Sequence, residues 1–260
     1  MNYKLVILDV DGTILPHGKT KLSHATKAAI QQLREKKIQL IIATGRAPYF
    51  SDSIIQETGV ESMVFFNGSY AYHQGIEIYK SAINKQILEK VHLLSNDFQH
   101  PLTFLSGTSF KSTDLSHPYV IEAYQHDPWK PELAPAQFWT DEDIYQLFLH
   151  CDLEEELHYQ TNVPELDFRR WSSGARTCDV NLSNSNKAVG ITKLLEKLGI
   201  APDEAVAFGD GLNDIEMLSL VGMGVAMGSG RDELKQVANM VTLSAEEDGV
   251  RYGLERLGLI

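Results

Sequence analysis

Short apolar runs that each stop at a polar turn constrain the fold of this chain more than any other feature. Three such runs fill residues 4–8, 38–43 and 63–66. Their length and their content of branched and apolar residues are typical of strands buried on both faces. The segments between them, 24–36 and 48–58, have helical patterns, with Ser23 as a candidate N-cap of the first. This alternation predicts a parallel sheet with crossover helices.

The alternation is interrupted in the middle of the chain and then returns. From about residue 96 to 182 aromatic, polar and proline residues interleave without a clear strand–helix rhythm. The rhythm resumes with a predicted helix at 187–198, closed by Gly199, and a predicted strand at 205–208. We therefore expect an α/β protein with a Rossmann-like parallel-sheet core, residues 1–82 and 187–260, and an inserted α+β domain, residues 83–186.

Polar residues follow each predicted core strand at the point where the strand ends. In an open parallel sheet, ligands bind beyond the carboxyl ends of the strands. Four carboxylates, several glycines and an arginine therefore meet at one edge of the predicted sheet. They belong to the turns Asp9-Val10-Asp11-Gly12-Thr13, Thr44-Gly45-Arg46, Asn67-Gly68 and Gly209-Asp210-Gly211-Leu212-Asn213-Asp214.

The closely spaced carboxylates Asp9 and Asp11 suggest a chemistry for this edge. Side chains two residues apart on an extended chain point to one face, so their charges need a cation nearby or one of them must be protonated. Mg²⁺ meets the first need, with Asp210 as a further oxygen ligand. Protonation of one carboxylate meets the second need, because the ionised carboxylate can then attack phosphorus while its protonated partner donates a proton to the leaving group.

Groups that could hold a phosphoryl group are also present at this edge. Thr44 can donate its hydroxyl, Gly45 its backbone N–H, and Lys187 a positive charge. Each of these motifs alone is equally consistent with an ordinary turn or a solvated lysine. Their joint placement after buried strands favours a site, and no G-x-x-x-x-G-K-[ST] phosphate loop occurs as an alternative.

These residues together closely resemble the haloacid dehalogenase superfamily of phosphatases, in its Cof-like branch, whose members carry a C2B-type cap domain. The resemblance covers the whole predicted core, whereas the inserted domain matches the cap by position and length. One departure is Ser229-Gly230, where the family often has Asn-Ala. The matching segments are Leu8–Thr13, Thr44–Arg46, Lys187, Phe208–Leu218, Gly224–Gly228 and Glu247–Val250.

The resemblance implies a role for each site residue. Asp9 is expected to attack phosphorus and to ligate Mg²⁺ with its other oxygen, and the Asp11 side chain to serve as acid and base. The remaining implied roles are metal binding by the Asp11 carbonyl and Asp210, support of the metal by Asp214, phosphate binding by Thr44, Lys187 and Asn213, and proximity to the substrate channel for Arg46 and Asn67.

Composition sets limits on partners and location. The formal net charge of −12 disfavours binding to nucleic acid. No signal-peptide pattern or membrane-length apolar run is present, which predicts a cytoplasmic protein, monomeric or weakly dimeric, acting on a small phosphorylated metabolite. Cys151 and Cys178 are expected to be reduced thiols, although the sequence leaves a disulfide between them open. In the inserted domain, Arg169 and Arg170 are candidate substrate contacts.

Three functions remain open at this point. The leading hypothesis is Mg²⁺-dependent hydrolysis of a small phosphate monoester, such as a sugar phosphate or a phosphorylated cofactor. A phosphosugar mutase differs only in the group that accepts the phosphoryl from Asp9. A non-catalytic sugar-phosphate binding module would have no need for Asp9, Asp11, Lys187 and Asp210 together.

Overall fold

A computed structural model describes residues 3–126, 129–172 and 174–260. The chain forms two compact units, which are considered separately. The first comprises Met1–Arg46, Ser51–Lys80 and Asn186–Ile260, and the second comprises Ala47–Phe50 and Ser81–Ser185. Apart from the short segment Ala47–Phe50, the chain leaves the first unit after residue 80 and returns at residue 186, whereas the sequence pattern placed these points at residues 82 and 187.

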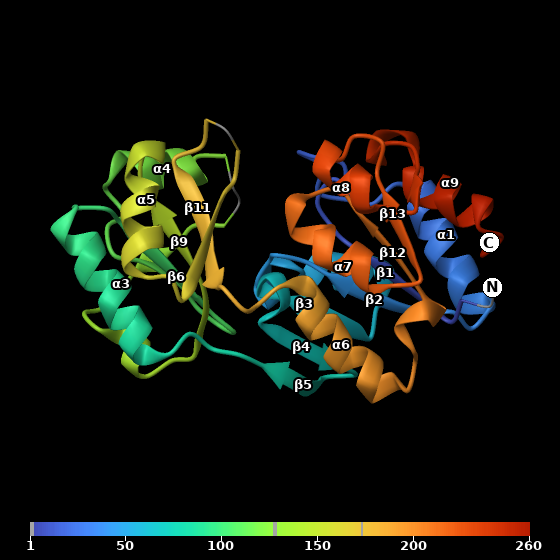
Figure 1. The fold of residues 1–260 in the computed structure, drawn as a ribbon, viewed down its shortest axis with the longest axis horizontal. Helices are drawn as coiled ribbons and strands as arrows, with labels where there is room; N and C mark the ends of the chain where they lie inside the picture. The colour runs from blue at the N-terminus through green and yellow to red at the C-terminus, as the bar shows by residue number, and fades with distance from the viewer. Residues whose placement is uncertain (1–2, 127–128, 173) are drawn as a thin grey trace. The chain divides into compact units, whose positions relative to one another are not determined.

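The first unit is built on a sheet of eight strands in the order β14-β13-β12-β1-β2-β3-β4-β5 (Figure 1). Neighbours from β14 to β3 are parallel, and β4 and β5 add an antiparallel edge. The predicted Rossmann-like parallel core is therefore confirmed. The strands are β1 (Leu5–Leu8), β2 (Gln39–Ala43), β3 (Ser62–Phe65), β4 (Tyr70–His73), β5 (Ile76–Lys80), β12 (Ala205–Gly209), β13 (Met223–Ala226) and β14 (Met240–Val241).

Helices cover both faces of this sheet. On one face α6 lies over β2 to β5 and α7 over β12 and β13, while α1 and α9 lie side by side in the layer on the other face (Figure 1). Alternate residues of each central strand point to opposite faces, so both faces need a cover. The helices of this unit are α1 (His24–Glu35), α2 (Asp52–Thr58), α6 (Lys187–Leu198), α7 (Ile215–Leu220), α8 (Asp232–Val237) and α9 (Gly249–Arg256).

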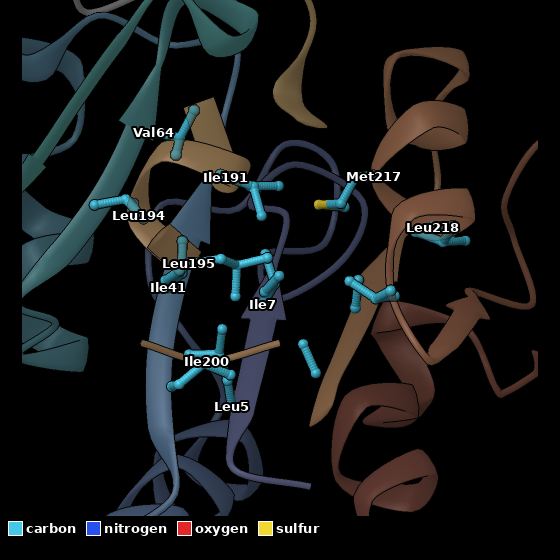
Figure 2. Packing of buried hydrophobic residues seen from close by; sticks show 14 of the residues in the cluster. Leu5, Ile7, Ile41, Val64, Ile191, Leu194, Leu195, Ile200, Met217 and Leu218 are labelled. Carbon is cyan, nitrogen blue, oxygen red and sulfur yellow. The ribbon is translucent and has the colours of Figure 1, made fainter. Parts of the chain in front are cut away.

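The core between the sheet and helices α6 and α7 is made of branched and unbranched aliphatic side chains (Figure 2). Leu5 and Ile7 of β1 are fully buried and lie in one cluster with Ile191 and Leu194 of α6. Truncating one such leucine to alanine typically costs about 2–5 kcal/mol of stability. This packing holds β1 and α6 in a fixed relation, which matters because each carries a site residue at its end.

The ends of α6 follow local sequence signals. Asn186 is the N-cap, and its side-chain oxygen accepts a hydrogen bond from the backbone N–H of Val189 at 3.2 Å. Gly199 ends the helix in the left-handed conformation, with φ 66°, as its position after the apolar pattern predicts. The helix therefore begins at Lys187, which places that lysine in the first turn.

Two predicted helices begin differently from the expectation. The segment 48–58 is a 3₁₀ turn at Pro48–Phe50 followed by α2, with a break at Ser51, whose φ of −115° is not helical. Residues 212–220 form a 3₁₀ turn, Leu212–Asp214, and then α7. In the second case the Asp214 carboxylate bonds backbone amides ahead of the helix, which favours the tighter first turn.

The second unit has a six-stranded sheet in the order β10-β11-β9-β6-β7-β8. Its neighbours are antiparallel except for the pair β7 and β8. A separate core packs helices against it, and Cys151 and Cys178 are buried there as free thiols. Its elements are α3 (Lys85–Asp97), β6 (Leu102–Ser106), β7 (Phe110–Ser112), α4 (Pro118–Tyr124), β8 (Glu132–Leu133), β9 (Ile144–His150), α5 (Leu153–Asn162), β10 (Leu166–Arg170) and β11 (Thr177–Leu182).

The points where the chain leaves and re-enters the first unit are neighbours within that unit. Lys80, at the end of β5, pairs with Tyr70. Asn186 packs against the turn just before Tyr70, since a Cβ on Gly68 would lie 1.9 Å from the Asn186 carbonyl oxygen. Only glycine therefore fits at position 68.

Among the described residues, no helix is long and apolar enough to cross a membrane.

Candidate functional site

The candidate site lies where the chain order of the sheet reverses. β1 pairs with β2 on one side and with β12 on the other, and Leu8 stands opposite Phe208. The chain extends the sheet from β1 toward β3, and later from β12 toward β14 on the opposite side. Such a switch point opens a crevice at the carboxyl ends of the strands. Asp9 follows β1 directly and Asp210 follows β12, so both carboxylates lie at this crevice.

Lys187 joins two of the site carboxylates. Its Nζ donates to Asp9 Oδ1 at 2.5 Å and to Asp214 Oδ1 at 2.6 Å. The Lys187 and Asp214 side chains are fully buried, and that of Asp9 is 8% exposed. A buried ammonium needs such partners, because burial of an unpaired charge is very costly. The three residues come from α6, the end of β1 and the turn after β12, so the ion pairs also tie these segments together.

Asp214 is held by the backbone of its own turn as well. Its Oδ2 accepts from the backbone N–H groups of Asp210 and Gly211, each at 3.0 Å. Gly209 leaves room for this arrangement, since a Cβ there would lie 2.6 Å from the Asp214 carboxylate. Asp214 thus orients both Lys187 and the turn that carries Asp210. The Gly-Asp-Gly-x-Asn-Asp motif was the sequence signal that pointed to such a role.

Asp210 completes the acidic cluster. Its side chain is 14% exposed, accepts from Thr13 Oγ1 at 3.3 Å, and lies 3.6 Å from Nε2 of His17. Gly12 makes the close approach possible, because a Cβ there would lie 2.1 Å from Asp210 Oδ2. The contacts of Thr13 and His17 with Asp210 were not predicted, since nothing in the spacing of residues 9–17 shows which side chains turn toward residue 210.

The cluster carries more negative than positive charge. Burial raises the pKa of Asp9 well above its usual value, and Asp214 and Asp210 add to this effect while Lys187 opposes it. Burial, together with Asp214, raises the pKa of Asp210 to about 6. Burial lowers the pKa of Lys187, but the Asp214 and Asp9 carboxylates outweigh it and hold that pKa above its usual value. One ammonium therefore does not balance three carboxylates.

The donor set fits a hard divalent cation. One ligand atom from each of Asp9, Asp210 and Asp214 lies within 4.8 Å of the others. Carboxylate oxygens are the ligands that Mg²⁺ and Ca²⁺ prefer, and a divalent charge would favour the ionised forms of Asp9 and Asp210, which burial and the neighbouring carboxylates disfavour. Both oxygens of Asp214 already accept hydrogen bonds, one from Lys187 and the other from backbone amides. Asp9 and Asp210 are therefore the more available metal ligands.

Asp11 is placed differently from Asp9. Its side chain is 49% exposed and is gripped by Arg46, whose Nε donates to Oδ2 at 2.8 Å and whose Nη2 donates to Oδ1 at 2.5 Å. The two carboxylates of the Asp-x-Asp pair thus have separate cationic partners, Lys187 for the buried one and Arg46 for the exposed one. The resemblance placed Arg46 near the substrate channel without a partner, and that role stays a prediction.

The other predicted phosphate-binding residues lie on the turns after β2 and β12, the two strands that flank β1. Thr44 is buried, and its Oγ1 accepts from the backbone N–H of Arg46 at 3.1 Å. Asn213 donates from Nδ2 to Oδ1 of Asn67 at 2.9 Å. Gly45 lies against the Asn67 side chain. The structure therefore brings Thr44, Gly45, Asn67 and Asn213 together at the crevice. Contacts of Thr44, Gly45 and Asn213 with a phosphoryl group stay predictions, as does the place of Asn67 near the substrate channel.

Arg169 and Arg170 are engaged within the second unit. Arg169 pairs with Asp167 at 2.7 Å and is 39% exposed. Arg170 is 9% exposed and donates to the carbonyls of Cys151, Asp152 and Ala175, and to Glu156 at 2.9 Å. These bonds give Arg170 a structural task in holding the strand ends of its sheet. A substrate contact for either arginine stays a prediction.

Comparison with known proteins agrees with this geometry. The family model of the haloacid dehalogenase-like hydrolases matches residues 6–254. The putative phosphatase YkrA of Bacillus subtilis (strain 168) is 34% identical over the full length of both chains. The same organism's 5-amino-6-(5-phospho-D-ribitylamino)uracil phosphatase YitU is 29% identical, covering 95% of this chain and 94% of its own.

Among solved structures, the phosphatase BT1666 from Bacteroides thetaiotaomicron, of the same superfamily, superposes with a TM-score of 0.91 at 28% identity. The match covers 99% of this chain and 96% of that one. The family match covers most of the first unit, and with it every residue of the acidic cluster. The chain therefore belongs to the haloacid dehalogenase-like hydrolase family, and it is a phosphatase.

Proposed function

We propose that this phosphatase hydrolyses a small phosphate monoester, a sugar phosphate or a phosphorylated cofactor, with Mg²⁺ as its metal and Asp9 as its nucleophile. The observation that carries the proposal is the shared Lys187 ammonium between the buried carboxylates of Asp9 and Asp214, beside Asp210. An ion pair that served only stability would not need a third carboxylate beside it, because the added negative charge is not balanced by the single ammonium.

In the proposed first step an oxygen of Asp9 forms a bond to phosphorus, and the bond between phosphorus and the ester oxygen breaks. The leaving oxygen takes a proton from the Asp11 carboxyl, so an alcohol departs and an aspartyl-phosphate remains on Asp9. In the second step Asp11 accepts a proton from water, which attacks phosphorus and releases inorganic phosphate and the free Asp9 carboxylate.

The surrounding residues support the proposed step by position and charge. Lys187 fixes Oδ1 of Asp9, which orients the carboxylate. Asp9, Asp210 and the Asp11 carbonyl would hold Mg²⁺, which when bound neutralises charge on the phosphoryl oxygens. Arg46 must release the Asp11 carboxylate for Asp11 to carry a proton, because a bidentate guanidinium favours the ionised form.

The proposed substrate class rests on the relatives. YitU is named for a phosphorylated ribityl compound, and it aligns with nearly the whole of this chain. The exposed Asp11 fits a role at the leaving group, which differs among esters, while the buried Asp9 fits a role at the phosphoryl group, which is common to all of them.

A panel of phosphate esters, assayed for inorganic phosphate with Mg²⁺ and with EDTA, tests the proposal. Turnover that requires Mg²⁺, and that Asp9→Asn abolishes while the circular dichroism spectrum is unchanged, is the expected result. Undiminished turnover by Asp9→Asn would sink the assignment of the nucleophile. Transfer of phosphate to a second sugar position, in place of its release, would identify a mutase, and an absence of turnover on every ester would contradict the proposed substrate class.

A further inference from the structure

Asn67 occupies a conformation that side chains rarely adopt. It lies in the 3₁₀ turn Phe66–Gly68 after β3, with φ 53° and ψ 34°, in the left-handed region. It is only 7% exposed. Asparagine tolerates this region better than most residues, and strain of this kind persists where the surroundings hold it. The contacts of the Asn67 side chain therefore need an explanation.

The Asn67 carboxamide lies between two turns of the site. On one side its Oδ1 accepts from Nδ2 of Asn213 at 2.9 Å. On the other side it packs on the bare Cα of Gly45, where a Cβ would lie 3.0 Å from Oδ1 and 3.2 Å from Nδ2. Its backbone N–H also donates to the carbonyl of Thr44 at 3.2 Å. Asn67 thus links the turn after β2 with the turn after β12.

We infer that Asn67 is a positioning residue, which orients the Asn213 carboxamide for the phosphoryl group and acts only through it. The inference rests on the proposed function and deepens it. The Asn213 amide has two hydrogens, and Asn67 takes one of them. This bond fixes the rotation of the Asn213 carboxamide, so that the second hydrogen is held for a phosphoryl oxygen. Gly45 contributes by leaving space for the Asn67 carboxamide.

This role differs from a direct substrate contact in a measurable way. A residue that touches the leaving group affects each ester differently, and it keeps its effect when Asn213 is truncated. A residue that acts through Asn213 loses its effect in that background, because coupled residues are not additive. Inorganic phosphate has no leaving group, so its binding reports on the phosphoryl group alone.

The experiment measures binding of inorganic phosphate, with Mg²⁺, by isothermal titration calorimetry, and turnover of p-nitrophenyl phosphate. The variants are Asn67→Gly, Asn213→Ala and the double variant. Glycine removes the carboxamide but accepts φ 53° without strain. Gln74→Gly is the matched control, because Gln74 is also left-handed, with φ 50°, and lies in the β4–β5 turn.

Asn67→Gly is expected to weaken phosphate binding about tenfold and to lower kcat for the ester, since one partly buried amide hydrogen of Asn213 loses its acceptor. In the Asn213→Ala background the same change is expected to alter phosphate binding less than about twofold. Gln74→Gly should match the parent in both assays.

Equal losses from Asn67→Gly in both backgrounds would overturn the inference. Parent-like phosphate binding by Asn67→Gly would overturn it as well. Both results leave the proposed function standing if the parent hydrolyses esters, whereas a parent that turns over no ester contradicts the proposed function. The calorimetry needs no turnover, so the role of Asn67 in phosphate binding is decided in either case.

Discussion

Replacing Gly12 with alanine tests whether the close approach of the first turn to Asp210 builds the metal site. Gly12 has φ +79°, and an added Cβ would lie 2.1 Å from Oδ2 and 2.5 Å from Cγ of Asp210. Gly18 is the matched control, because it has φ +75° and a Cβ added there would meet no heavy atom within 4 Å. Both changes force alanine into the left-handed region, at a cost of about 1–2 kcal/mol. Only Gly12→Ala also displaces Asp210.

The size of the effect follows from the displacement. Carbon and oxygen atoms pack at roughly 3.5 Å, so the Asp210 carboxylate must move by more than about 1 Å. Displacements of about 1 Å in such sites cost on the order of 100-fold in function, and we expect Mg²⁺ affinity to fall by about that factor. At a Mg²⁺ concentration of about 100 times the parent Kd, stabilisation by the metal would then drop from about 2.7 to about 0.4 kcal/mol.

Calorimetric titration with Mg²⁺ gives the affinity, and urea unfolding followed by circular dichroism gives the stabilisation. Gly18→Ala is expected to keep the parent affinity within about twofold, because its strain lies outside the cluster. Parent-like Mg²⁺ affinity in Gly12→Ala would refute the reasoning, since Asp210 would then not be a ligand or would not be held by this contact.

Three further predictions concern charge. Lys187→Met should lower turnover by about 10²–10³-fold, measured on the best ester of the panel, because the ammonium that orients Asp9 is lost; an active variant would contradict its role. Arg170→Met should destabilise the second unit by about 3 kcal/mol in urea unfolding, because Glu156, whose side chain is only 12% exposed, loses its cation; a changed KM with unchanged stability would instead indicate a substrate contact. Burial lowers the pKa of His150 to about 3, against about 6.5 in an unfolded chain. As the pH falls below about 6.5, the unfolded chain takes up a proton on His150 while the folded chain does not, so the free energy of unfolding decreases until the pH reaches about 3. The decrease is about 2 kcal/mol at about pH 5. Tryptophan fluorescence reports on unfolding of the second unit, which holds His150 and all three tryptophans. His150→Gln should make the free energy of unfolding depend less on pH. An unchanged slope in that variant would contradict the assignment.

The sheet was predictable because burial on both faces leaves a clear mark in the sequence. The apolar runs before Asp9, Thr44 and Asp210 could be recognised from composition alone, and the rule that ligands bind beyond parallel strands then brought their polar turns together. The topology of the second unit was not predictable in this way. Its antiparallel strands pair by register rather than by a repeated strand–helix unit, and the sequence carries no simple record of register.

Side-chain contacts within the site were predictable only in part. The need of Asp9 for a cation follows from charge, but the choice of Lys187 for Asp9 and Arg46 for Asp11 depends on where helix α6 and the turn after β2 place their side chains. The contact between Asn67 and Asn213 joins turns that lie far apart in the chain. Nothing local to either residue indicates it, and the left-handed backbone of Asn67 becomes visible only in the structure.

The pairing of β1 with β12 has a consequence for how the protein folds. Leu5 and Ala205 are direct partners although about 200 residues separate them, so the acidic cluster cannot assemble until a very long loop closes. If the second unit folds first, the residues inside it no longer add to the effective length of this loop. The chain leaves and re-enters the first unit at adjacent points, Lys80 and Asn186, so a folded second unit keeps the two parts of the chain close. Folding of the inserted unit would thus accelerate formation of β1–β12, and the acidic cluster would form only after this closure.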